Sequence, residues 1–214
     1  MIRKDIDDFL STIPDNVTVV AATKYVDSSD MVNLLEHGIN NFGENRVDSF
    51  LEKYYKLKEY PNIKWHFIGH LQRNKAKDVI DKIDYLHSLD SIELAKIIDK
   101  SRTTPLNVFV EVSINLEESK NGVPYYEAKE FVKKLLEYKN INLIGLMMMA
   151  HKNSEQAYEE FSKLTKLKEE IENDLNIKIP YLSMGMSDDY LEAIKAGATH
   201  IRLGRILYEK NHSN

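Results

Sequence analysis

The chain has 214 residues, with 29 Lys plus Arg against 34 Asp plus Glu and a net charge of -5. This length suffices for a sizeable core in one large domain or two small ones, and the acidic balance argues against nucleic-acid binding, which requires a basic face. Cysteine is absent, which excludes disulfides, thiolate nucleophiles and Cys-ligated zinc. The N-terminus "MIRKDIDDFL" is too charged for a signal peptide, and no apolar run approaches about 18 residues. We therefore expect a soluble, cytoplasmic protein that binds neither nucleic acid nor membrane.

Apolar, β-rich runs alternate with segments of helical period along the whole chain. In chain order the predicted strands span 17–23, 39–42, 63–68, 83–88, 106–114, 141–149, 179–184 and 200–203. Helical periodicity is clearest in 125–139 and 158–175, where apolar residues recur on one stripe. Gly38 and Gly197 each stand where a helix would end before a strand, as left-handed caps do.

This alternation predicts parallel strands, because parallel neighbours are joined by helical crossovers. Eight such units favour a closed (β/α)8 TIM barrel of the α/β class, and an open doubly wound sheet is the alternative. No Pro/Gly/Ser-rich linker interrupts the series, so we expect a single domain over residues 1–214. In a barrel of this kind the chemistry belongs at the C-terminal ends of the strands.

Lys24 lies at such an end, in the stretch "VTVVAATKYVDSSD" of residues 17–30. Period-2 alternation puts Lys24 on the same face as Thr18, Val20 and Ala22. If this face lines the barrel axis, the amine points into the mouth, where a partly desolvated lysine can form a Schiff base with a carbonyl compound. The alternative is a strand-end lysine that extends to solvent. Taken alone, the pattern favours this alternative.

The end of the chain predicts a phosphate site. "SMGMSDD" at 183–189 closes the seventh strand and "HIRLGR" at 200–205 closes the eighth, and the loops after these strands are the frequent phosphate site of the barrel. Ser187 would supply a hydroxyl at a helix start, and Gly204 a close backbone approach; their ordinary alternatives are an N-cap and a turn glycine. A nucleophilic lysine and a phosphate cup together predict a ligand with both an aldehyde and a phosphate, and pyridoxal 5′-phosphate fits.

The chain resembles the pyridoxal phosphate homeostasis protein family along nearly its whole length. The matching residues are "AATK" with Lys24, "FGENR" at 42–46, "IKWHFIGHLQRNK" at 63–75, Glu118, Lys120 and Gly122 in "NLEESKNG", "GLM" at 145–147, "LSMGMSDD" and "IRLG". The resemblance implies a fold-type III barrel like the N-terminal domain of alanine racemase, with Lys24 forming the internal aldimine. It also implies that Arg202 faces the pyridine nitrogen, and that Ser187, Gly204 and Arg205 hold the phosphate, the last two through backbone N–H groups.

Two segments depart from the usual pattern of this family. "ILYEK" places Tyr208 and Glu209 where the family usually has an apolar pair and a glycine, which affects the outer rim of the phosphate cup. "MMMAHKN" places His151 where relatives often have a small residue and a proline. We interpret His151 as a solvated loop histidine.

Two further residues are candidates for contact with the cofactor. Asn45 could hydrogen-bond its ring oxygen or an approaching substrate, and the alternative for Glu44 and Asn45 is turn and cap chemistry. Met147 could touch the ring face, although the run 147–149 is more typical of barrel packing.

Other polar residues are interpreted as structural. His66 and His70 do not form a metal site, because four strand rises of about 3.3 Å separate them by ~13 Å. We expect His66 to be buried and hydrogen-bonded, and His70 to lie at the strand end. The cluster "RNKAK" at 73–77 is interpreted as a solvated helix start.

The combination favours a carrier over an enzyme. An arginine cannot accept a proton from the pyridine nitrogen, so the ring would stay largely unprotonated and act as a weak electron sink. Alanine racemases add a tyrosine from an extra domain of the partner subunit, and no tyrosine here is an obvious replacement. We therefore expect a monomer that binds pyridoxal phosphate reversibly and passes it to apoenzymes. The alternatives are a low-activity amino-acid racemase using Lys24 as one base, and a phosphate-binding barrel, such as a sugar-phosphate isomerase, in which Lys24 forms no Schiff base.

Overall fold

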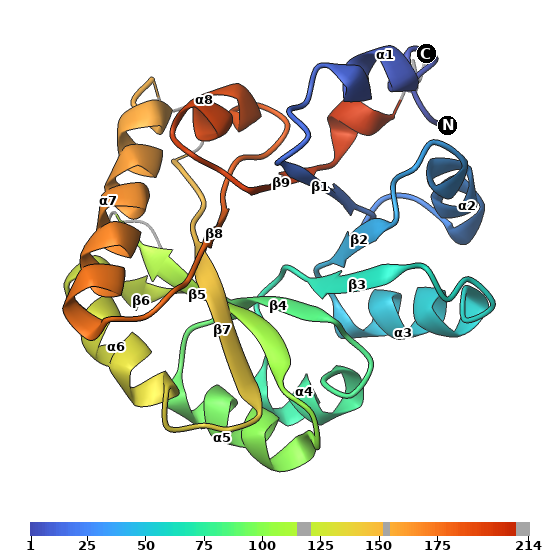
Figure 1. Cartoon of the computed structure of the whole chain (residues 1–214). Coiled ribbons are helices and arrows are strands. Elements are labelled where there is room, and N and C mark those ends of the chain that lie inside the picture. Colours follow the sequence, from blue (N-terminus) through green and yellow to red (C-terminus); the bar gives the residue numbers. More distant parts are fainter. Residues whose placement is uncertain (115–120, 152–154, 209–214) are drawn as a thin grey trace.

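The computed structural model describes residues 1–114, 121–151 and 155–208. Its parallel strands close into a barrel (Figure 1). Around the ring the strands are β4 (Tyr85–Leu89), β3 (Lys64–Phe67), β2 (Asn41–Glu44), β1 (Thr18–Ala22), β9 (His200–Leu203), β8 (Tyr181–Ser183), β7 (Ile141–Met147) and β5 (Leu106–Ser113). Pairing of β4 with β5 closes the ring, so the predicted TIM barrel is confirmed and the open sheet is wrong.

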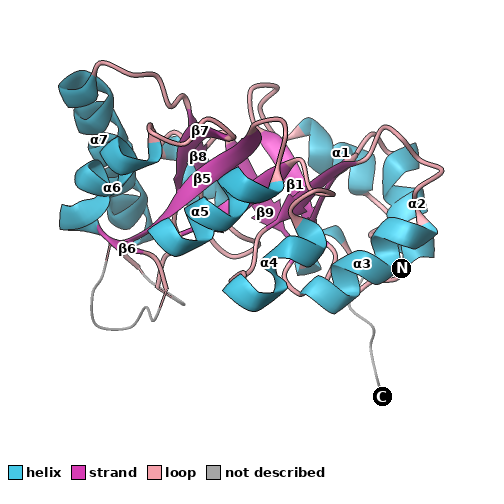
Figure 2. Ribbon diagram, turned by 90° about the horizontal axis from the view of Figure 1, so that it is seen from below, coloured by secondary structure: helices cyan, strands magenta, loops and turns pink. Residues whose placement is uncertain are grey.

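Helices surround the barrel on its outside, as Figure 2 shows in cyan. They are α1 (Ile6–Ser11), α2 (Ser28–Glu36), α3 (Val47–Lys56), α4 (Arg73–Val79), α5 (Ile92–Ser101), α6 (Ala128–Leu135), α7 (Ala157–Leu175) and α8 (Tyr190–Lys195), with the 3-10 turns η1 (Tyr125–Glu127) and η2 (Arg205–Leu207). The Asp27 side chain accepts the first free N–H groups of α2. Gly38 and Gly197 have φ of +80° and +107°, which confirms the predicted left-handed positions. No helix in the described ranges has the length and apolar character to span a membrane.

The predicted strands agree with the observed ones to within two residues at each end. One strand was missed. β6 (Val123–Pro124) pairs with Val112 and Ser113 and extends the sheet beside the end of β5. Two residues carry no periodicity, so only the pairing with β5 defines this strand.

The strands have two different faces. Val19 and Ala21 pack with the helices in the large outer core, whereas Val20 is fully buried on the opposite face of β1. Of the residues of β1 that were predicted to face the barrel axis, Val20 is therefore confirmed. The barrel interior is partly aromatic and polar. There the His87 ring stacks on Phe109, with ring centroids 4.4 Å apart.

Candidate functional site

Lys24 lies in the turn that follows β1, at the C-terminal mouth of the barrel. The preceding Thr23 is buried and fastens this turn to β2: its N–H donates to the Gly43 carbonyl at 3.0 Å, and its Oγ1 donates to Glu44 Oε1 at 2.6 Å. The Lys24 side chain is exposed, and its Nζ lies 4.6 Å from the centroid of the Tyr25 ring. Lys24 thus lies at the strand end, as expected. The expected partial desolvation of its amine is not found, because the side chain is exposed.

A buried ion pair supports the Lys24 turn from behind. Lys53, on α3, is 6% exposed and its Nζ donates to both Glu44 Oε1 and the Thr23 carbonyl. Glu44 is fully buried, and its second oxygen has no hydrogen-bond partner among the described residues. The sequence analysis missed this pair. Its signal was a lysine on the apolar stripe that Val47 and Phe50 begin on α3.

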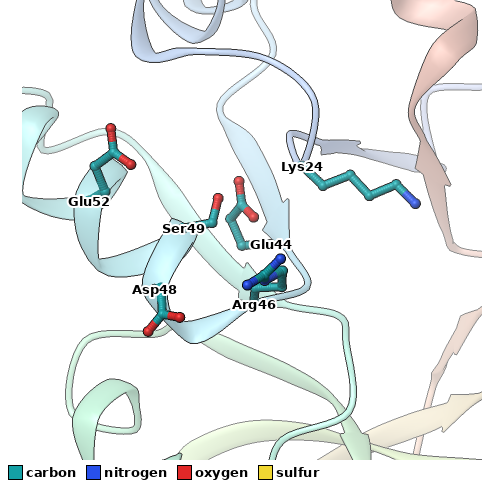
Figure 3. Close-up of a pocket in the computed structure, with 6 residues that line it drawn as sticks. All are labelled: Lys24, Glu44, Arg46, Asp48, Ser49 and Glu52. Carbon is teal, nitrogen blue, oxygen red and sulfur yellow. The ribbon is translucent and has the colours of Figure 1, made fainter.

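A pocket of about 280 Å³ opens beside this turn (Figure 3). It is lined by Lys24, Glu44, Arg46, Asp48, Ser49 and Glu52. The side chain of Lys24 points away from the other lining residues in Figure 3. Because carboxylates outnumber the cations here, the pocket is unsuited to a phosphate dianion. The predicted phosphate cup lies elsewhere, on the other side of β1.

Ser187 lies beside the backbone that follows β9, next to Gly204 as expected and to Ile206 rather than Arg205. The N–H groups of Gly204 and Ile206 point to Ser187 Oγ at 3.2 and 3.5 Å. Two backbone donors therefore converge between the ends of β8 and β9, as an anion site requires. The Arg205 side chain pairs instead with Asp188 at the surface, so only its backbone remains for the predicted role.

The helix expected to open at Ser187 begins three residues later, at Tyr190. Asp189 is the physical reason, because its Oδ1 accepts the Met186 N–H at 2.7 Å and its own N–H donates to the Met186 carbonyl at 3.1 Å. These two bonds hold 186–189 as a turn. The alternative interpretation of Ser187 as an N-cap is therefore wrong.

Arg202, on β9, is 4% exposed and its guanidinium is held inside the barrel. Nη1 donates to Ser183 Oγ at 2.6 Å, and Nη2 donates to the Met148 carbonyl at 2.9 Å. Burial lowers the pKa of Arg202 to about 10, and the nearby carboxylates of Glu111 and Asp189 oppose this effect. The guanidinium therefore stays charged at neutral pH and presents a fixed donor group.

Asn45 and Met147 lie at strand ends of the same mouth. Asn45 directly follows β2, and its Oδ1 is buried without a hydrogen-bond partner in the described part of the chain. Such an atom costs about 1–3 kcal/mol until a donor satisfies it, which favours a ligand contact. Met147 ends β7 and is buried with Phe109 and Ile144, which supports the packing interpretation.

The histidine predictions are confirmed for His66. It is fully buried and bonded through both ring nitrogens, to His87 Nε2 at 2.8 Å and to Asn41 Oδ1 at 2.9 Å. His70 is half-exposed, with Nδ1 3.9 Å from the Asp90 carboxylate. Within 1–114, 121–151 and 155–208 no group of three or more potential ligands could hold a metal ion.

His151 is not a simple solvated histidine. Its N–H donates to Glu160 Oε2 at 3.0 Å and its Nδ1 lies 3.1 Å from Oε1 of the same buried carboxylate. The 73–77 cluster does begin a helix, α4, and its Arg73 and Lys77 are exposed as expected. Tyr208 forms an isolated antiparallel β-bridge with Ile2, near the N-terminus. The motif residues Glu118 and Lys120, and Glu209, lie outside the described residues.

Three buried histidines predict that the free energy of unfolding decreases in acid. Burial lowers the pKa of His66 and of His87 well below the ordinary value, and lowers that of His200 to about 4. In the unfolded chain the same rings bind a proton near pH 6.5, at roughly their ordinary pKa. Below that pH the unfolded state therefore binds more protons, and the free energy of unfolding falls.

Two carboxyl groups act in the opposite sense. Burial raises the pKa of Glu111 to about 7 and also raises that of Asp189, so protonation stabilises the folded chain as the pH falls. Glu111 and His200 nearly cancel, because their pKa values move by similar amounts in opposite directions. The net change in the free energy of unfolding with pH is therefore set by His66 and His87. Urea unfolding should show a progressive loss of stability from about pH 6.5 towards pH 4; a level or rising profile would contradict this.

Comparison with known proteins identifies the family. Residues 2–212 match the family described as "Alanine racemase, N-terminal domain". The chain is 38% identical over 195 residues to a pyridoxal phosphate homeostasis protein of Aquifex aeolicus, covering 89% of this chain and 85% of the relative. It is 36% identical over 207 residues to the protein of the same name in Synechocystis sp., covering 94% of each. This chain belongs to the pyridoxal phosphate homeostasis protein family.

Solved structures agree with this membership. PipY of Synechococcus elongatus, solved with pyridoxal phosphate (PLP) bound, has a TM-score of 0.88 and 27% identity, covering 95% of this chain and all of PipY, 100%. An alanine racemase of Clostridium difficile has a TM-score of 0.76 at 18% identity, and the chain covers 59% of it. The racemase shares the fold. The resemblance of the chain to the pyridoxal phosphate homeostasis protein family, predicted from its sequence motifs, is thus confirmed.

Proposed function

We propose that this chain binds pyridoxal 5′-phosphate reversibly, acts in the homeostasis of that cofactor, and has little or no catalytic activity. One observation carries the proposal: the three groups that such a ligand needs come from three adjacent strands. An amine follows β1, a charged guanidinium stands on β9, and two convergent N–H groups lie between the ends of β8 and β9. The names of the relatives and the PLP-bound PipY structure support the same ligand.

Each group has a proposed role. The cofactor supplies an aldehyde, which condenses with a primary amine with loss of one water and is released again by hydrolysis. Lys24 is the proposed amine, and Arg202 donates to the pyridine nitrogen. Ser187 and the backbone N–H groups of Gly204 and Arg205 would hold the phosphate, with the Ile206 N–H beside them.

Asn45 and Met147 complete the proposed site. The Asn45 side chain would donate a hydrogen bond from its Nδ2 group to the ring oxygen. Met147 would contact the ring face. The remainder of the proposal is a cytoplasmic monomer, one barrel domain over residues 1–214, that delivers the cofactor to PLP-dependent apoenzymes.

Two measurements on the PLP-loaded protein test the function. Mixed with an apo-aminotransferase, the loaded protein should restore aminotransferase activity, because reversible binding releases the cofactor. Incubated with L-alanine in heavy water, it should exchange the Cα proton no faster than free pyridoxal phosphate does. Faster exchange would favour the racemase alternative, and failure to bind the cofactor would overturn the proposal.

Replacing Ser187 with alanine should weaken PLP binding about tenfold, because one hydrogen bond to a charged phosphate is lost. The covalent anchor remains, so the visible band should keep its position. Equilibrium dialysis measures the change. Ser162→Ala is the matched control, since Ser162 lies on α7 and donates only to the Tyr158 carbonyl of its own helix. Equal affinities of the two variants would exclude Ser187 from the phosphate site.

A further inference from the structure

A continuous file of polar side chains crosses the barrel interior from Arg202 to β2. Arg202 Nη1 lies 2.6 Å from Ser183 Oγ, which lies 2.7 Å from His87 Nδ1. His87 Nε2 lies 2.8 Å from His66 Nδ1, and His66 Nε2 lies 2.9 Å from Asn41 Oδ1. The file joins β9, β8, β4, β3 and β2, and its three central side chains are each at most 1% exposed.

The directions of the hydrogen bonds in this file follow from its far end. The Asn41 Nδ2 group donates to Asn40 Oδ1 at 3.1 Å, which leaves the Asn41 oxygen to accept from His66 Nε2. A neutral His66 then accepts at Nδ1 from His87 Nε2, and a neutral His87 accepts at Nδ1 from the Ser183 hydroxyl. The near end is consistent with this order, because the Arg202 guanidinium has only donors and leaves the Ser183 hydroxyl proton for His87.

The two rings are held in place and uncharged. His87 stacks on Phe109, and His66 stacks on Tyr85 with ring centroids 4.3 Å apart. Burial lowers the pKa of both histidines; His200 acts in the same sense on His66, and His66, Arg202 and His200 do so on His87. Neutral rings are what the file requires, because each ring must accept at Nδ1 and donate at Nε2.

We propose that Ser183 and His87 are positioning residues for Arg202, an inference that rests on the proposed function. A serine hydroxyl rotates freely unless its proton has a partner. His87 binds that proton, which keeps the oxygen lone pairs of Ser183 directed at the guanidinium. Together with the Met148 carbonyl, Ser183 fixes both terminal nitrogens of Arg202. The plane of the guanidinium is thereby set before the cofactor arrives, and its other N–H groups remain for the pyridine nitrogen.

The wild-type apoprotein gives the first test. Nitrogen-15 NMR of labelled histidine at pH 7 should show His66 and His87 each with one proton, on Nε2. A proton on Nδ1 of His87 would reverse the file and overturn the proposal. This readout does not depend on cofactor binding, so it also holds if a variant fails to fold.

The second test compares Ser183→Ala and His87→Phe with the matched control His200→Phe. His200 is also buried in the barrel interior, with its ring centroid 6.3 Å from that of His87, but its Nδ1 is hydrogen-bonded to Thr199, which is not a member of the file. All three variants should keep the covalent anchor. In Ser183→Ala and His87→Phe we expect PLP affinity to fall about tenfold, and the bound spectrum to become pH-dependent as the pyridine nitrogen loses its fixed donor.

The outcomes separate this inference from the proposed function. Wild-type binding with unchanged affinity and spectrum in Ser183→Ala and His87→Phe would overturn the positioning role and leave the proposed function intact. The same change in His200→Phe as in the other two would also overturn it, since the effect would then come from the barrel interior in general. No binding by the wild type would overturn the proposed function, and with it the role of Ser183 and His87 toward the cofactor.

Discussion

Replacing Lys24 with alanine should abolish the visible absorption band that pyridoxal phosphate acquires on binding the wild-type chain. No other lysine amine of the described residues lies at the end of β1, and Lys53 is buried and already donates to two acceptors. The proposed phosphate-binding groups and Arg202 remain in the variant. We therefore expect residual binding that is about 100-fold weaker, equivalent to ~2.7 kcal/mol.

The matched control for this result is Lys166→Ala, on the exposed face of α7. It should bind and absorb as the wild type does. Titration followed by visible absorption and by equilibrium dialysis separates the covalent bond from the weaker binding. A band that persists in Lys24→Ala would show that another amine is the anchor. The absence of the band from both proteins would favour the third alternative, a phosphate-binding barrel in which Lys24 forms no Schiff base.

Lys53→Ala should lower the free energy of unfolding by about 3–5 kcal/mol, because it leaves the buried Glu44 carboxylate without a cation. Lys53 is 6% exposed and Glu44 is fully buried, so the carboxylate is poorly solvated once its partner is lost. The Thr23 carbonyl also loses its donor. Since Thr23 precedes Lys24, the same variant should bind PLP more weakly.

The chain contains a matched pair on the same helix. Lys56 and Glu52 form an exposed ion pair on α3, and Lys56→Ala should cost no more than about 1 kcal/mol. The double variant Lys53→Met with Glu44→Gln should recover part of the lost stability, because no buried charge then remains. Urea unfolding measures all three. Equal losses in the free energy of unfolding for Lys53→Ala and Lys56→Ala would mean that the buried ion pair stabilises the fold no more than the exposed pair does.

The fold could be predicted from the sequence because its signals are local. Each parallel strand is a short apolar run, each crossover carries helical period, and Gly38 and Gly197 mark helix ends that need positive φ. β6 could not be predicted, because two residues become a strand only through their pairing with β5. The helix expected at Ser187 begins later for a local reason, since the Asp189 side chain binds the Met186 N–H and residues 186–189 form a turn.

The site was predicted only in part. Lys24, Ser187 and Gly204 lie just beyond strand ends, where the barrel rule and the family motifs both point, and Arg202 lies within β9. Their supporting groups come from long-range packing that no spacing reveals. Ser183 and His87 are 96 residues apart in the chain and meet across the barrel interior.

Lys24 is the proposed covalent anchor of reversibly bound pyridoxal phosphate, and reductive trapping of the bound cofactor distinguishes it from every other lysine of the chain. The PLP-loaded wild-type protein is reduced with borohydride, which makes the bond between amine and aldehyde carbon permanent, then digested and analysed by peptide mass spectrometry. We expect one pyridoxyl group per chain, on Lys24. A label on another lysine, or none at all after binding has been demonstrated, would contradict it.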